Sequence, residues 1–159
     1  MCNAGADAGV SVLNRFIEAQ DRPAGGSTIY DSALTELHAG RKSSHWIWFV
    51  FPQIAGVAEW YGAKPSATAR HFAIVDRSEA EAFADHPVLG ARLNLAFRAA
   101  AESGEADPVR LMGGIDAAKL KSSATLFSES AGAKASALSI LDTLYGGETC
   151  PATTAILAR

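Results

Sequence analysis

The chain has 159 residues, of which 48% are apolar, 19% charged and 8% aromatic, and its formal net charge is -3. That length suits one domain, which can bury roughly 70% of the surface of its unfolded chain without a disulfide or metal staple, and the apolar fraction excludes wholesale disorder. The slightly acidic balance excludes a protein that coats nucleic acid, because such proteins need a surplus of cations.

The first residues and the most apolar stretch argue against export and against a membrane. Residues 1–9 are rich in alanine and glycine, and we expect a flexible tail there before a single domain over residues 10–159. No basic stretch precedes a long apolar run, as a secretory signal requires. The most apolar stretch, 46–58, contains a proline and is too short to cross a bilayer. We therefore expect a cytoplasmic protein with no membrane partner.

The two cysteines, Cys2 and Cys150, lie far apart and outside any CxxC or Cys/His spacing. This pattern predicts reduced thiols, with no disulfide framework and no metal site. The HExxH, GxSxG and GxGxxG motifs are also missing from the sequence, which disfavours a zinc protease, an α/β-hydrolase and a Rossmann enzyme. We expect no cofactor.

Apolar residues recur at helical spacing along the first half of the chain. They predict one helix with its apolar face over residues 10–17 and a second that begins at Ser27 or Thr28. The aromatic run 45–53 fits either a buried strand or a short buried helix, and its helical flanks favour the helix. Glycine and proline in residues 56–65 predict a loop.

Capping residues and prolines mark helix starts in the second half. Ser78 and Glu81 form a capping box, and Asp116 follows a Gly-Gly turn as the predicted cap of a later helix. Further helices are predicted over 66–72, 88–104 and 138–145, and from Pro108 and Pro151. The sequence thus predicts about seven or eight helices and shows few strand signals. This pattern predicts one compact, mainly α domain.

The first constellation that points to chemistry is GRKSSHWIWFVFPQ, residues 40–53. Its two cations can hold a phosphate or carboxylate, and its indoles can stack on a flat ring. Its imidazole titrates near neutral pH and is a candidate general acid or base, and its amide can pair with a base-like edge. The alternative is a core segment whose aromatics fill space and whose histidine binds a backbone carbonyl. The candidate residues are Arg41, Lys42, His45, Trp46, Trp48 and Gln53.

The second constellation is DAAKLKSSATLF, residues 116–127. On a helix, Lys119, Ser122 and Ser123 lie near one face, where a lysine with clustered hydroxyls can hold an anion. Asp116 is a second candidate for proton transfer. The spacing is not that of a P-loop. The alternative is a capping aspartate, a solvated lysine face and hydroxyls that bond back to the helix.

Four blocks of the sequence carry a resemblance to a known family. They are RFIEAQ at 15–20, ALTELHAGRKSSHWIWFVFPQ at 33–53, EAFADHPVLGARL at 81–93 and the block at 116–127. On these blocks the chain resembles the Domain of Unknown Function 1810 family, from about Val10 to Leu157. The resemblance implies a mainly helical domain of small bacterial proteins and no established activity. Some members carry a calpastatin label, which does not fit a compact chain.

The chain departs from the family pattern at two places. The stretch GLGxS that usually follows FPQ is replaced by residues 54–64, with Ser66 as the candidate for its serine. The aspartate that usually precedes PAT is replaced by Cys150. Because cysteine is a poor helix cap, we expect the last helix to be less firmly anchored.

The two constellations together predict a site for an anionic small molecule, either phosphorylated or nucleotide-like, of the NAD or ADP-ribose kind. Hydrolysis of that molecule is the leading hypothesis for an activity, with His45 and Asp116 as the proton-transfer residues. One alternative is a binding module with the same pocket and no catalysis. Another is a helical interaction or homo-oligomerisation domain whose aromatic run is core or interface. The composite site requires that the two constellations meet in space.

Overall fold

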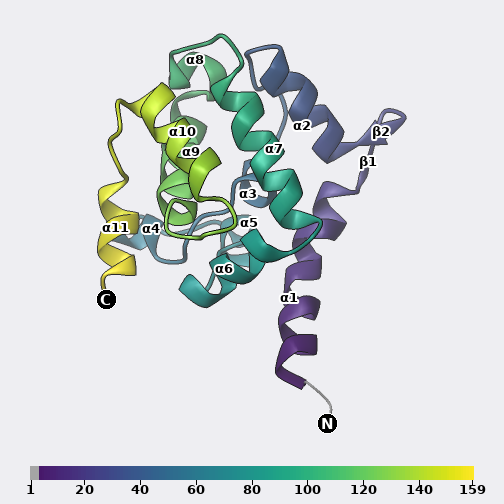
Figure 1. Cartoon of the computed structure of the whole chain (residues 1–159), viewed down its shortest axis with the longest axis vertical. Coiled ribbons are helices and arrows are strands. Elements are labelled where there is room, and N and C mark those ends of the chain that lie inside the picture. The colour runs from purple at the N-terminus through teal and green to yellow at the C-terminus, as the bar shows by residue number, and fades with distance from the viewer. Residues whose placement is uncertain (1–3) are drawn as a thin grey trace.

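Helices account for nearly all regular structure in the computed structural model, which describes residues 4–159, with side chains described from residue 12 (Figure 1). The one sheet of this part pairs β1 (Pro23–Ala24) with β2 (Ser27–Thr28) in antiparallel register. The mainly α prediction is therefore confirmed, with more helices than expected. The helices are α1 (Ala4–Gln20), α2 (Ile29–His38), α3 (Ile47–Val50), α4 (Val57–Trp60), α5 (Ala67–His71), α6 (Arg77–Asp85), α7 (Leu89–Ala101), α8 (Pro108–Met112), α9 (Gly114–Phe127), α10 (Lys134–Tyr145) and α11 (Pro151–Leu157).

Buried aromatic rings connect the helices at the centre of the fold, where α10 packs against both α7 and α9. The rings of Phe51 and Phe97 stack with centroids 5.1 Å apart and planes 7° apart. Phe127 contacts Phe97 at 6.3 Å and Phe83 at 5.4 Å, and Phe16 of α1 meets Phe83 edge-on at 5.0 Å. These five rings are fully buried, and their contacts extend the core from α1 to α9.

Several helix starts fall where the sequence predicts them, and two do not. Thr28 caps α2 by accepting from the amide of Asp31, and Asp107 caps α8 ahead of a proline. The capping box at Ser78 is wrong, because Asp76 caps α6 by accepting from the amide of Glu79 at 2.9 Å. The cap predicted for α9 is also wrong: Gly113 occupies that position.

The aromatic run is a short helix followed by extended chain. Only α3 is helical, and beyond it Ile54 pairs with Ile74 in an isolated parallel bridge. The amide of Ile74 donates to the carbonyl of Gln53 at 2.8 Å, and the amide of Ala55 donates to the carbonyl of Ile74 at 2.8 Å. The loop predicted over 56–65 contains the four-residue helix α4. This bridge holds the chain after α3 against the chain after α5.

Some predictions for the N-terminus lie outside the described residues. Of the flexible tail predicted over residues 1–9, residues 4–9 belong to α1, and residues 1–3, which include Cys2, lie outside the described part. Cys150 is a buried free thiol at the start of α11 and makes no side-chain cap, as expected. In the described part of the chain, none of the helices has the length and apolar character that a membrane span requires.

Candidate functional site

The two polar constellations lie side by side, joined through Asp116 in the first turn of α9. Its carboxylate lies 2.9 Å from the ammonium of Lys42 and 3.9 Å from that of Lys119. The same two ammonium groups sit over indole rings, that of Lys42 4.8 Å from the centroid of Trp46 and that of Lys119 5.0 Å from that of Trp48. Two cations thus share the carboxylate of Asp116 beside α3.

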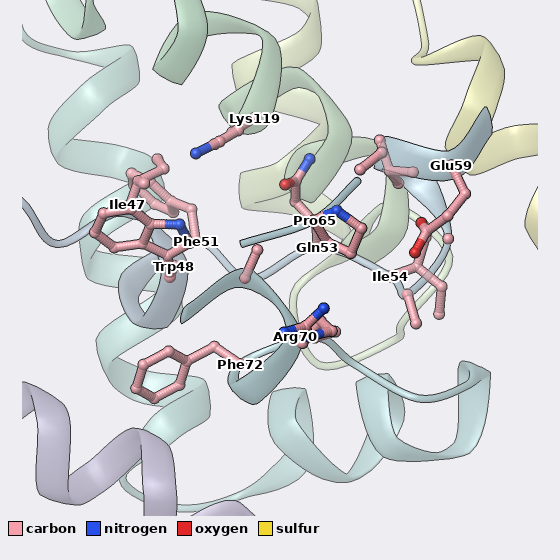
Figure 2. A pocket seen from close by; sticks show the side chains of 16 residues that line it. Ile47, Trp48, Phe51, Gln53, Ile54, Glu59, Pro65, Arg70, Phe72 and Lys119 are labelled. Atoms are coloured by element: carbon pink, nitrogen blue, oxygen red, sulfur yellow. The ribbon is translucent and has the colours of Figure 1, made fainter. Parts of the chain in front are cut away.

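A cavity of about 180 Å³ opens beside Trp48. Three predicted site residues line it: Trp48, Gln53 and Lys119. Two other charged residues, Glu59 of α4 and Arg70 of α5, complete the polar lining, together with an apolar floor that includes Phe72. In Figure 2, Trp48 and Glu59 lie on opposite sides of the view, with Gln53 and Arg70 between them and Lys119 above.

Trp46 does not line this cavity and has no free face for a ligand ring. It is fully buried, its ring packs edge-on against Phe51 at 5.9 Å, and its Nε1 donates to Glu36 Oε1 at 3.1 Å. The prediction that Trp46 stacks on a ligand is therefore corrected: its indole belongs to the core.

The two serines of α9 also face the interior of the protein and do not line the cavity. Ser122 shares a hydrogen bond of 2.7 Å with the hydroxyl of Thr153 in α11, in a buried contact that ties the last helix to α9. Ser123 is fully buried, and its hydroxyl has no hydrogen-bond partner within the described residues. Both serines are removed from the anion-binding set that the sequence predicted.

The predicted proton-transfer residues do not face the cavity either. His45 is exposed and lies outside its lining, and Asp116 is held between two lysines at the rim. Arg41 and Lys42 line a separate hollow against α8, opposite Arg110. Asp116 forms its closer ion pair with Lys42, at 2.9 Å, and its longer one with Lys119, at 3.9 Å.

Arg15, in the first family-like block, clamps one wall of the cavity. Its guanidinium donates to the carbonyl oxygens of His71 at 2.8 Å and Ala73 at 3.0 Å, and pairs with Glu79 at 3.0 Å. These contacts fix the chain that follows Arg70. A fork of planar donors suits this task, because one guanidinium can satisfy several acceptors at once.

Glu36 of α2 fixes the turn that precedes α3. Its carboxylate accepts hydrogen bonds from the amides of Ser43 and Ser44, from the Ser44 hydroxyl and from the Trp46 indole. Burial raises the pKa of the Glu36 carboxyl, but these hydrogen bonds outweigh it and hold that pKa below its usual range. Glu36 thus positions the turn that carries Trp46 through Ser43 and Ser44.

Gln20 fixes the same segment from the other side. It is 1% exposed, and its amide donates to the carbonyl of Phe49 at 2.9 Å and accepts from Arg92 at 3.1 Å. The buried side chain of Gln20 therefore connects the last residue of α1 and the first turn of α7 to α3.

The fold and the cavity define a class of protein: a small helical domain with a cavity lined by an indole, two cations and a carboxylate. The chain belongs to the family described as Protein of unknown function (DUF1810), whose model matches residues 11–157. It is 35% identical to the conserved hypothetical protein Rv1873 from Mycobacterium tuberculosis, with a TM-score of 0.82, over 92% of this chain and 96% of that one. No curated protein matches at a significant level. The family resemblance seen in the four sequence blocks is confirmed.

Proposed function

We propose that the cavity beside Trp48 binds a phosphorylated small molecule that carries a flat ring, of the nucleotide or ADP-ribose kind. The observation that carries this proposal is the placement of Arg70 and Lys119 on one cavity with the half-buried indole of Trp48. The anion would lie between the two cations, and the ring would lie on the face of the indole away from the Lys119 ammonium.

The cavity lining carries two cations, Arg70 and Lys119, against one carboxylate, Glu59, and this surplus of positive charge favours an anionic ligand. Within residues 12–159, the guanidinium of Arg70 forms no ion pair, so its donors are available to a ligand. Lys119 pairs only loosely with Asp116, which lies closer to Lys42. A guanidinium that lines the same cavity as a second cation suits phosphate, because its planar donors match the phosphate oxygens in pairs.

The size of the cavity and its indole limit the ligand further. Stacking of a base on an aromatic side chain contributes about 1–3 kcal/mol. A volume of about 180 Å³ is below the roughly 300–1,000 Å³ typical of sites for drug-sized molecules. It fits a sugar phosphate, with a larger nucleotide extending onto the rim at Trp48. The side-chain amide of Gln53 lies between Trp48 and Glu59 in Figure 2, and it can donate and accept hydrogen bonds with such a ligand.

A binding module without catalysis is the second candidate, because neither His45 nor Asp116 lines the cavity. Hydrolysis of the bound molecule is the more specific form of our proposal. A turnover assay distinguishes a hydrolase from a binding module. A ligand that binds and is recovered unchanged after long incubation would favour the module. An oligomerisation role would instead make Trp48→Ala shift the protein to a smaller species without any ligand.

We expect AMP, ADP-ribose or NAD to raise the melting temperature of the protein, and Arg70→Gln and Lys119→Ala each to weaken binding about tenfold. A ligand at 100 times its dissociation constant adds about 2.7 kcal/mol of stability, enough for a shift of several degrees in a domain of this size. The measurement is a thermal-shift titration, followed by calorimetry on the compound that binds.

His45→Ala is the matched control, since it removes a polar side chain of the same sequence block that lies outside the cavity. It should bind as tightly as the unmodified chain. The proposal fails if no compound shifts the melting temperature, or if Arg70→Gln and Lys119→Ala bind as well as His45→Ala.

A further inference from the structure

The side of the cavity farthest from Trp48 carries a carboxylate. Glu59, on α4, lines the same cavity as Arg70, and Figure 2 shows its side chain extending toward the middle of the view. In the described part of the chain, Glu59 forms no ion pair and no side-chain hydrogen bond, with Arg70 or with any other residue. One small cavity is thus lined by an exposed carboxylate and an exposed guanidinium that form no ion pair with each other.

A carboxylate repels a phosphate because both are negatively charged. Glu59 would therefore contact a different part of the ligand. An ionised carboxylate only accepts hydrogen bonds, and its partner must therefore be a donor. Sugar hydroxyls are donors that come attached to phosphates, and an acidic side chain on a ribose hydroxyl is a recurrent arrangement in nucleotide sites.

We infer that Glu59 binds the hydroxyls of a sugar whose phosphate lies between Arg70 and Lys119, so that the ligand is a ribose phosphate or a molecule that ends in one. The inference rests on the proposed function. Figure 2 shows Arg70 between Trp48 and Glu59, which matches the order ring, phosphate, sugar of ADP-ribose, whose terminal ribose is joined to its adenosine through phosphates. The ring of AMP is attached to its sugar, so AMP would occupy only part of this arrangement. A volume of about 180 Å³ accommodates the sugar and its phosphate together.

The test compares ribose 5-phosphate with 2-deoxyribose 5-phosphate, which carry the same charge and differ by one hydroxyl. Calorimetric titrations of the unmodified chain should show that ribose 5-phosphate binds about tenfold more tightly, since a hydrogen bond to a charged group contributes about that much. In Glu59→Ala this preference should fall to about one. Glu81→Ala removes an exposed glutamate of α6 outside the cavity and should keep the preference.

The outcomes separate this inference from the proposed function. Equal affinity for the two sugar phosphates in the unmodified chain overturns the role of Glu59 and leaves the phosphate site standing. The same holds if Glu59→Ala keeps the preference, or if ADP-ribose binds while ribose 5-phosphate does not. If AMP, ADP-ribose, NAD and both sugar phosphates all fail to bind, the proposed function falls and this inference falls with it.

Discussion

The Gly90→Ala variant is expected to lose about 3 kcal/mol of unfolding free energy, the largest effect we predict for a single methyl group. A Cβ at Gly90 would lie 2.1 Å from the carbonyl oxygen of Ala84. That oxygen belongs to the backbone at the end of α6, so it can move only if α6 shifts against α7. Gly132 approaches the same carbonyl from the segment before α10, where a Cβ would lie 2.7 Å away. Chemical denaturation monitored by circular dichroism measures the loss.

Gly114→Ala is the matched control for this substitution. Gly114 begins α9 with ordinary helical geometry, and nothing lies within 4 Å of the Cβ that alanine would add. Because alanine favours the helix and restricts the unfolded chain, this variant should keep its stability or gain up to about 1 kcal/mol. Similar losses in Gly114→Ala and Gly90→Ala would show that close packing against Ala84 is not the cause.

The helices could be predicted from the sequence because their apolar spacing and their caps agree. Thr28 and Asp107 each stand directly before a periodic stretch and cap the helix that follows. The start of α6 differs from the prediction because Asp76 caps the helix in place of Ser78. Asp76 and Glu79 have the same spacing as Ser78 and Glu81, so the spacing alone does not distinguish the two starts. Glu79 accepts from the amide of Val75 and pairs with Arg15, and these contacts favour the earlier start.

The candidate site could be predicted only in part, because neighbouring residues of one motif point in opposite directions. Trp46 is the N-cap residue of α3, and Trp48 lies inside that helix two positions further on. The structure buries the first and leaves the second at the cavity. The motif that contains both indoles identifies the segment of the chain that forms the site. Which of the two rings a ligand can reach depends on tertiary contacts.

Glu59 and Arg70 were missed for a different reason. Each stands alone in a short segment without a recognisable motif, and the two meet because the parallel bridge between Ile54 and Ile74 brings those segments together. Isolated charges are most often solvated, so nothing in their local sequence marks them. The bridge itself involves one residue on each side, too little to produce a strand pattern.

The second large effect is expected at Glu36, where Glu36→Ala should lose about 2 kcal/mol of unfolding free energy. The substitution removes the acceptor of the Ser44 amide and of the fully buried Trp46 indole together. An unpaired buried donor costs more than the net value of the bond that it lost. Urea denaturation at neutral pH measures the change, and Glu36→Gln, which keeps an acceptor oxygen at the same position, should lose less than half as much.

The charge of Glu36 gives this prediction a pH dependence. Hydrogen bonds hold the pKa of the folded carboxyl below its usual range, whereas the unfolded chain has a glutamate pKa of about 4.3. The unfolded state therefore takes up the proton first as the pH falls, and the stabilisation is complete at neutral pH but is lost progressively below about pH 4.3. Denaturation curves at pH 7 and at about pH 4 should show a steeper loss in the unmodified chain than in Glu36→Gln, because glutamine does not titrate. Equal losses in the two proteins would mean that the ionised carboxylate is not what holds the turn in front of Trp48.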